Sequence, residues 1–210
     1  MEVLLAVLLI LGALLAGAAS PGPSFVLIAR MALGVSRRDA IAASFGMGLG
    51  GAIFATLALL GLNAILHSVP TMYMVFKVLG GLYLVYMAVR IWRTAKEPLA
   101  PVKAEQQQTH QSFYKSFSIG LLTQLSNPKT AIVHASIFAA LLPSGLPVIL
   151  YWILPLLVFV IEAAWYSLVV LTLSMPSPRA IYRRSKAKFD YLAASVMGAL
   201  GLKLVYSANE

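Results

Sequence analysis

The stretch Ser20-Pro21-Gly22-Pro23-Ser24 interrupts the first long apolar segment of the chain, and Ser126-Asn127-Pro128-Lys129 interrupts another. The two interruptions lie half of the 210-residue chain apart. Proline removes an amide hydrogen bond and clashes with the preceding turn, so hydrocarbon tolerates it only where the freed backbone groups face protein or a solvated cavity. A matched pair of such interruptions predicts two related halves with a binding site near the bilayer midplane.

Composition is that of an integral membrane protein. Hydrophobic residues make up 60% of the chain, charged residues make up 11%, and the mean hydropathy is +0.85. The net charge is +9, but Lys and Arg lie between the apolar segments, so anionic lipid headgroups rather than nucleic acid are the expected partner. Because the sequence has no cysteine, disulfides, thiolate metal sites and a cysteine nucleophile are excluded.

Six transmembrane helices are expected, of which the first and fourth are broken near the midplane. Each is long enough for about 30 Å of hydrocarbon. They cover residues 3–33, 40–62, 70–92, 114–142, 146–173 and 190–207. The segment before Ser20 imitates a signal peptide, but it has Glu2 in place of a basic start and leads into further apolar sequence. We therefore expect it to be the first half of helix 1.

Loop charges predict the orientation. The loops after spans 1, 3 and 5 hold most of the basic residues, and the loops after spans 2 and 4 hold none. The positive-inside rule then predicts that both termini are outside and that the two halves are inverted. We expect one membrane domain, with a first three-helix repeat at 1–93, a cytoplasmic linker at 94–112 and a second three-helix repeat at 113–210.

Two short segments are a second sign of duplication. Gly81–Ala88 and Gly201–Ala208 share six of eight residues at a spacing of 120. Chance recurrence of Gly, Leu, Val and Ala in membrane helices is the alternative explanation. The run that begins at Gly46 matches a dinucleotide-binding pattern but follows no strand, so we interpret Ala42, Gly46 and Gly50 as a small-residue face for close helix packing.

The interruptions have chemistry suited to an anion. Asn127 can cap a helix that restarts at Pro128, and Gly22-Pro23 can restart helix 1 in the same way. The two restarted helices would point their amide ends, which have partial positive charge, at the middle from opposite directions. Lys129 adds a full charge that suits a carboxylate. The alternative is that Pro128 is an ordinary kink and that Lys129 extends to the membrane surface.

Polar residues near the second interruption share one helical face: Gln124, Asn127, Thr130 and His134. Such a stripe predicts a cavity lining, although His134 alone fits a packing role as well as a proton relay. Glu162 lies inside the fifth span, where a carboxylate should be protonated, paired or in contact with water.

The acid Glu162 is therefore a candidate for coupling, with Lys129 and Lys77 as possible partners. A structural hydrogen bond to a backbone group or to Tyr166 is the alternative. Asp39 is a weaker coupling candidate, because Ser36 and Asp39 resemble a capping box at the start of helix 2.

Together these residues resemble the lysine-exporter (LysE/RhtB) family of bacterial amino-acid exporters. The likeness rests on Pro21-Gly22-Pro23, the turn Gly34-Val35-Ser36-Arg37-Arg38, the glycine-rich second helix and Ser126-Asn127-Pro128-Lys129. It implies efflux of amino acids across the inner membrane in exchange for protons, through an inverted-repeat six-helix bundle. Ser24 and Leu142-Pro143-Ser144 depart from the family pattern.

The expected site combines the residues at both interruptions. The predicted substrate-binding residues are Pro21, Gly22, Pro23, Ser24, Gln124, Asn127, Pro128, Lys129 and Thr130, and the coupling candidates are Glu162, Asp39 and His134. No metal or cofactor is expected. A small-ion exporter of the same architecture and a membrane-embedded enzyme are the alternative functions, and small-residue faces leave open whether the chain forms a homo-oligomer.

Overall fold

The computed structural model describes residues 2–20, 22–68, 70–97, 112–143 and 146–208. All regular structure in these ranges is helical, as predicted. The helices are α1 (Glu2–Ala19), α2 (Pro23–Gly34), α3 (Arg37–Ser68), α4 (Pro70–Thr94), α5 (Phe113–Leu125), α6 (Pro128–Leu141), α7 (Leu150–Leu173) and α8 (Pro176–Tyr206).

Three helical segments among the described residues are long and apolar enough to cross a membrane. They are Arg37–Gly61, Leu150–Leu173 and Ser185–Tyr206, and they agree with three of the six predicted spans. The pair α1 and α2 is apolar enough to form a fourth, with a bend of 61° between Val3–Ala19 and Pro23–Gly34. The predicted spans at 70–92 and 114–142 correspond to α4 and to the pair α5 and α6, and their crossing of the membrane stays a prediction.

Side-chain caps explain where two helices begin. Ser36 accepts a hydrogen bond at 3.0 Å from the Asp39 amide, which confirms it as the predicted side-chain cap of α3, and it donates its hydroxyl to Asp39 Oδ2 at 2.6 Å. Asn127 Oδ1 accepts from the Lys129 amide at 3.1 Å at the start of α6. Pro23 and Pro128 occupy first-turn positions in α2 and α6, where a missing amide hydrogen costs little.

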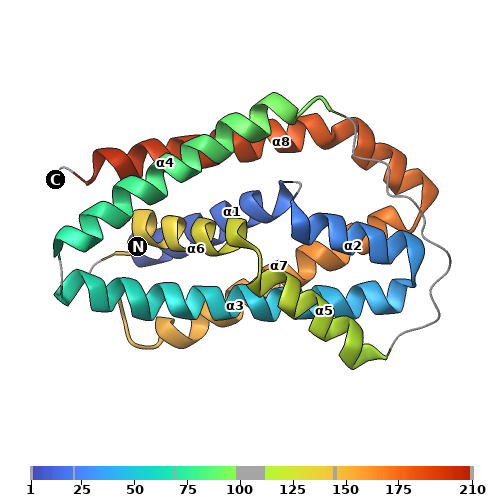
Figure 1. Ribbon diagram of the computed structural model, residues 1–210, viewed down its shortest axis with the longest axis horizontal. Coiled ribbons are helices and arrows are strands. Elements are labelled where there is room, and N and C mark those ends of the chain that lie inside the picture. Colours follow the sequence, from blue (N-terminus) through green and yellow to red (C-terminus); the bar gives the residue numbers. More distant parts are fainter. Residues whose placement is uncertain (1, 21, 69, 98–111, 144–145, 209–210) are drawn as a thin grey trace.

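Helices α1, α2 and α6 lie between α3 and the pair α4 and α8 (Figure 1). In this view α1 and α6 lie in one half of the molecule, and α2 and α5 lie in the other. Both α2 and α6 begin near the middle of the long axis and run toward opposite ends. Helix α3 packs along α7 and α5, and α4 packs along α8. The starts of α2 and α6 are thereby brought together inside the bundle.

Glycines allow the closest helix crossings. A methyl group on Gly46 would collide with the Phe117 carbonyl of α5, which confirms the close-packing role predicted for this face of α3. Between α4 and α8 the contact is reciprocal: a methyl on Gly81 would lie 2.7 Å from the Gly201 carbonyl oxygen, and a methyl on Gly201 would lie 2.7 Å from the Gly81 carbonyl oxygen. The two segments of similar sequence therefore pack against each other.

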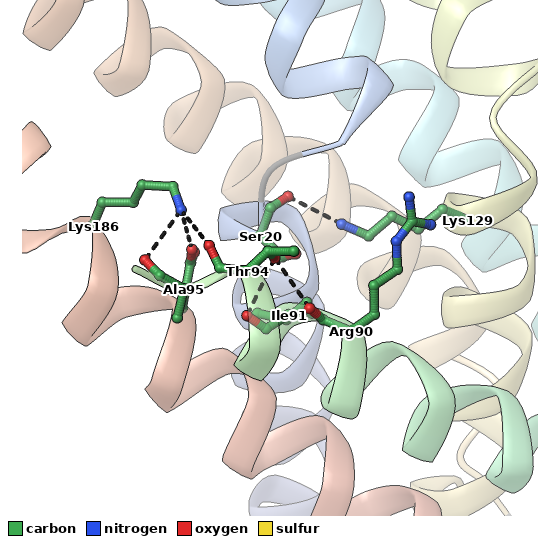
Figure 2. A network of polar contacts seen from close by, with 8 residues as sticks. Ser20, Arg90, Ile91, Thr94, Ala95, Lys129 and Lys186 are labelled. Atoms are coloured by element: carbon green, nitrogen blue, oxygen red, sulfur yellow. Dashed lines mark hydrogen bonds and ion pairs between the residues drawn. The ribbon is translucent and has the colours of Figure 1, made fainter. Parts of the chain in front are cut away.

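A buried charged group also joins α4 to α8. Lys186 Nζ donates to the carbonyl oxygens of Thr94 and Ala95 at 3.3 Å each and to Asp190 Oδ2 at 2.7 Å (Figure 2). A cation at the C-terminal end of α4 satisfies carbonyls that have no partner within the helix. This contact fixes one end of the α4–α8 pair.

Two apolar clusters fill the interior. One surrounds Ile10, Phe138 and Leu154, and the other surrounds Ile28 and Met47. Members of both clusters, Val133 of the first and Phe25 and Tyr166 of the second, contribute to one polar cavity. The polar groups at the helix interruptions thus lie where the two apolar clusters meet.

Candidate functional site

A small cavity lies where α2 and α6 begin. Its lining comes from α1, α2, α5, α6 and α7: Leu14, Gly17, Ala18, Ser20, Gly22, Ser24, Phe25, Gln124, Asn127, Lys129, Thr130, Val133, His134, Glu162 and Tyr166. Its volume of about 20 Å³ accommodates roughly one water molecule.

Hydrogen bonds link the two interruptions directly. Asn127 Nδ2 donates to Ser24 Oγ at 3.0 Å, and Ser24 Oγ donates to Gln124 Oε1 at 2.6 Å. Gln124 Nε2 then donates to Glu162 Oε2 at 2.7 Å. All four side chains are at least 96% buried. A continuous polar path therefore joins the starts of α2 and α6 to the acid of α7.

His134 and Tyr166 complete the acidic end of the cavity. His134 Nε2 lies 3.2 Å from Glu162 Oε1 without the alignment of a hydrogen bond, and His134 Nδ1 lies 2.9 Å from the Thr130 carbonyl oxygen. The hydroxyl of Tyr166 is within hydrogen-bonding range of Ser24 and Gln124. Glu162 therefore lies among polar groups whose hydrogen bonds to its carboxylate can rearrange when its charge changes.

Glycines of α3 make room for this acidic end. A methyl on Gly51 would collide with the Glu162 carboxylate, and a methyl on Gly50 would lie 2.7 Å from Gln124 Cβ. Sequence spacing predicted close packing for Gly50. The structure adds that these glycines hold the site side chains against the backbone of α3.

Lys129 forms the basic end of the cavity. Its Nζ donates to the Ser20 carbonyl oxygen at 3.0 Å, just past the end of α1 (Figure 2). It also lies 3.3 Å from the position that a methyl on Gly22 would occupy. A lysine of α6 therefore places its charge at the α1–α2 interruption, where a cation also satisfies a carbonyl at the end of α1.

The two lysines suggested as partners of Glu162 lie elsewhere. Lys129 bonds to Ser20, and Lys77 Nζ donates to the Ser207 carbonyl oxygen at 2.9 Å. The contacts of Glu162 are instead with Gln124 and His134, because residue spacing in sequence does not show which helices pack together.

Asp39 is not part of this cavity. It is 2% exposed, and Ser116 Oγ lies 3.4 Å from its Oδ1, in addition to its contacts with Ser36. Asp39 precedes Gly51 by twelve residues of α3, which is about 18 Å along the axis. Among the coupling candidates, the structure brings Glu162 and His134 together and leaves Asp39 apart.

The other predicted site residues have clear positions. Gly22, Ser24, Gln124, Asn127, Lys129 and Thr130 line the cavity, Pro23 and Pro128 begin the helices that bound it, and Pro21 lies outside the described residues. Sequence reasoning missed Ser20. Its place next to the first interruption was the available signal.

A helical membrane protein with a polar cavity where paired helix interruptions meet has the architecture of a membrane transporter. Comparison with known proteins identifies the family. The family model described as LysE type translocator matches residues 15–208, and the chain belongs to this family. The resemblance inferred from the sequence is thereby confirmed, and the chain is a transporter rather than an enzyme.

Relatives of similar length cover most of the chain. The threonine efflux proteins of Escherichia coli (strain K12) and Salmonella typhi are each 31% identical over 189 residues, or 90% of this chain and 91% of the relative. The membrane protein YahN of E. coli (strain K12) is 27% identical over 210 residues, or 98% of this chain and 92% of the relative. No solved structure matches the chain.

Proposed function

We propose that this protein is a secondary active exporter of amino acids or close derivatives that exchanges its substrate for protons across the bacterial inner membrane. Threonine is the first substrate to test, because two similar relatives are threonine efflux proteins. The proposal includes six spans in two inverted repeats with both termini outside. The reciprocal packing of Gly81 and Gly201 supports the duplication.

The observation that carries the proposal is the opposite charge at the two ends of one cavity. Lys129 provides a cation at one end, and Glu162 provides an acid beside His134 at the other. Lys129 and His134 both belong to α6, so one helix contributes to both ends of the cavity. A zwitterionic amino acid has one charge for each end, a carboxylate for Lys129 and an ammonium group for Glu162.

Proton coupling follows from competition at Glu162. The carboxylate can hold either a proton or the ammonium group of the substrate, and each neutralises the same buried charge. Gln124 Nε2 donates to Glu162 Oε2 at 2.7 Å, and the carboxylate can accept further hydrogen bonds from an ammonium group. A transporter that alternates between these two occupants exchanges substrate for protons.

The test is flux of labelled threonine, and of a panel of amino acids, in proteoliposomes with an imposed pH gradient. Wild type should accumulate substrate in response to the gradient. Glu162→Gln should lose this response, and the exchange of labelled for unlabelled substrate that remains should be slower and independent of pH. Asp39→Asn is the matched control, because it neutralises a buried acid outside the cavity, and it should respond to the gradient as wild type does.

Two outcomes would contradict this account. If wild type transports no amino acid, the proposed export function is wrong. If Glu162→Gln responds normally to the pH gradient, Glu162 has no role in proton coupling.

A further inference from the structure

Given the proposed function, we infer that the substrate carboxylate binds at the α1–α2 interruption alone, held by the Ser20 hydroxyl, the start of α2 and the Lys129 ammonium. The α5–α6 interruption then has a positioning role. This assigns Ser20 as a substrate-binding residue and replaces a symmetric pair of anion sites with a single one.

Ser20 has a buried hydroxyl that lacks a partner. Its side chain is 2% exposed and lines the cavity, and its Oγ makes no hydrogen bond to any residue that the structure describes. A buried hydroxyl without a partner is destabilising, and such groups in native structures call for an explanation. A carboxylate oxygen in the cavity would accept this hydrogen bond.

The starts of the two short helices differ in their caps. Asn127 covers the start of α6 by accepting from the Lys129 amide at 3.1 Å. The N-cap of α2 is Gly22, which has no side chain, so no side chain caps this helix. The first amides of a helix favour an anion when nothing else occupies them. Of the two helix starts, only that of α2 lacks a side-chain cap.

The ammonium group of Lys129 has hydrogens available for a ligand. One of its three ammonium hydrogens goes to the Ser20 carbonyl oxygen, and the others can reach a ligand. No ion pair of Lys129 with an acid is found among the described residues, and Asp190 Oδ2 of α8 accepts from Lys186 Nζ at 2.7 Å. Arg90 of α4 adds a second positive charge that acts on Lys129. The excess of positive charge at this end favours a bound carboxylate.

The experiment compares binding of labelled threonine and of threonine amide, which lacks the carboxylate charge, to purified protein. Wild type should prefer threonine. Ser20→Ala should weaken threonine binding by about tenfold and reduce that preference, since one hydrogen bond to a charged group is lost. Ser20→Thr retains the hydroxyl and should restore both.

Ser136→Ala is the matched control. Ser136 is 3% exposed, and its Oγ also lacks a partner among the described residues, but it is not among the residues that line the cavity. It should bind both ligands as wild type does. A Ser20→Ala protein with unchanged threonine affinity and unchanged preference would overturn the inference while leaving the exporter intact. Wild type that binds no amino acid would overturn both.

Discussion

At both helix interruptions a proline begins the second helix, but the two differ in whether a side chain caps that helix. At α5–α6, Asn127 occupies the helix start with its own side chain. At α1–α2, the same position is Gly22, and the neighbouring Ser20 hydroxyl has no partner in the described structure. Lys129 belongs to the α5–α6 interruption by sequence, but its side chain contacts the α1–α2 interruption. The comparison supports the proposal that α6 supplies the charge and that the start of α2 receives the ligand.

The largest expected effect comes from removing the charge that connects the two interruptions. Lys129→Met should lower the rate of threonine exchange in proteoliposomes by about a hundredfold, because a buried charge contact with the substrate is lost. Lys77→Met is the control, since Lys77 also donates to a backbone carbonyl, that of Ser207. Equal losses in both variants would show that Lys129 is only a structural contact.

A smaller effect should follow when the open helix start receives a cap of its own. Gly22→Asp places a carboxylate at the N-cap of α2, where it competes with the substrate for the same amides and for Lys129. We expect threonine affinity to fall by about tenfold in equilibrium binding. Asn127→Asp adds the same charge at the other interruption and should have a weaker effect, because a cap is already present there. A larger loss of threonine affinity in Asn127→Asp than in Gly22→Asp would mean that the carboxylate binds at the start of α6.

The smallest expected effect is one on stability. Asn127→Ala removes the cap of α6 and the donor to Ser24, which should lower the free energy of unfolding by about 1 kcal/mol. A thermal melt in detergent measures it, with Ser126→Ala as the control at an exposed neighbouring position. Unchanged stability would show that this cap does not hold the interruption in place.

Much of the architecture was predictable because local chemistry determines it. Proline positions predicted where α2 and α6 begin, and the caps at Ser36 and Asn127 were predictable from residue types alone. Hydropathy predicted the membrane class. The number of crossings and the inverted repeat depend on how the protein sits in a bilayer, and they stay predictions.

The site was predictable in its residues more than in its contacts. Gln124, Asn127, Thr130 and His134 line one cavity, although the start of α6 divides them between two helices. The pairing of Glu162 with Gln124 and the separation of Asp39 depend on how α3, α5 and α7 pack, which no local pattern specifies. Ser20 was missed because its place beside the first interruption does not by itself show that its hydroxyl is buried and without a partner among the described residues.

The most direct test of the account is a structure of the protein with bound threonine. The account predicts that the substrate carboxylate lies within hydrogen-bonding distance of Ser20 Oγ and Lys129 Nζ at the start of α2, with its ammonium group beside Glu162. A carboxylate found at the start of α6, or a substrate bound outside the cavity, would contradict it.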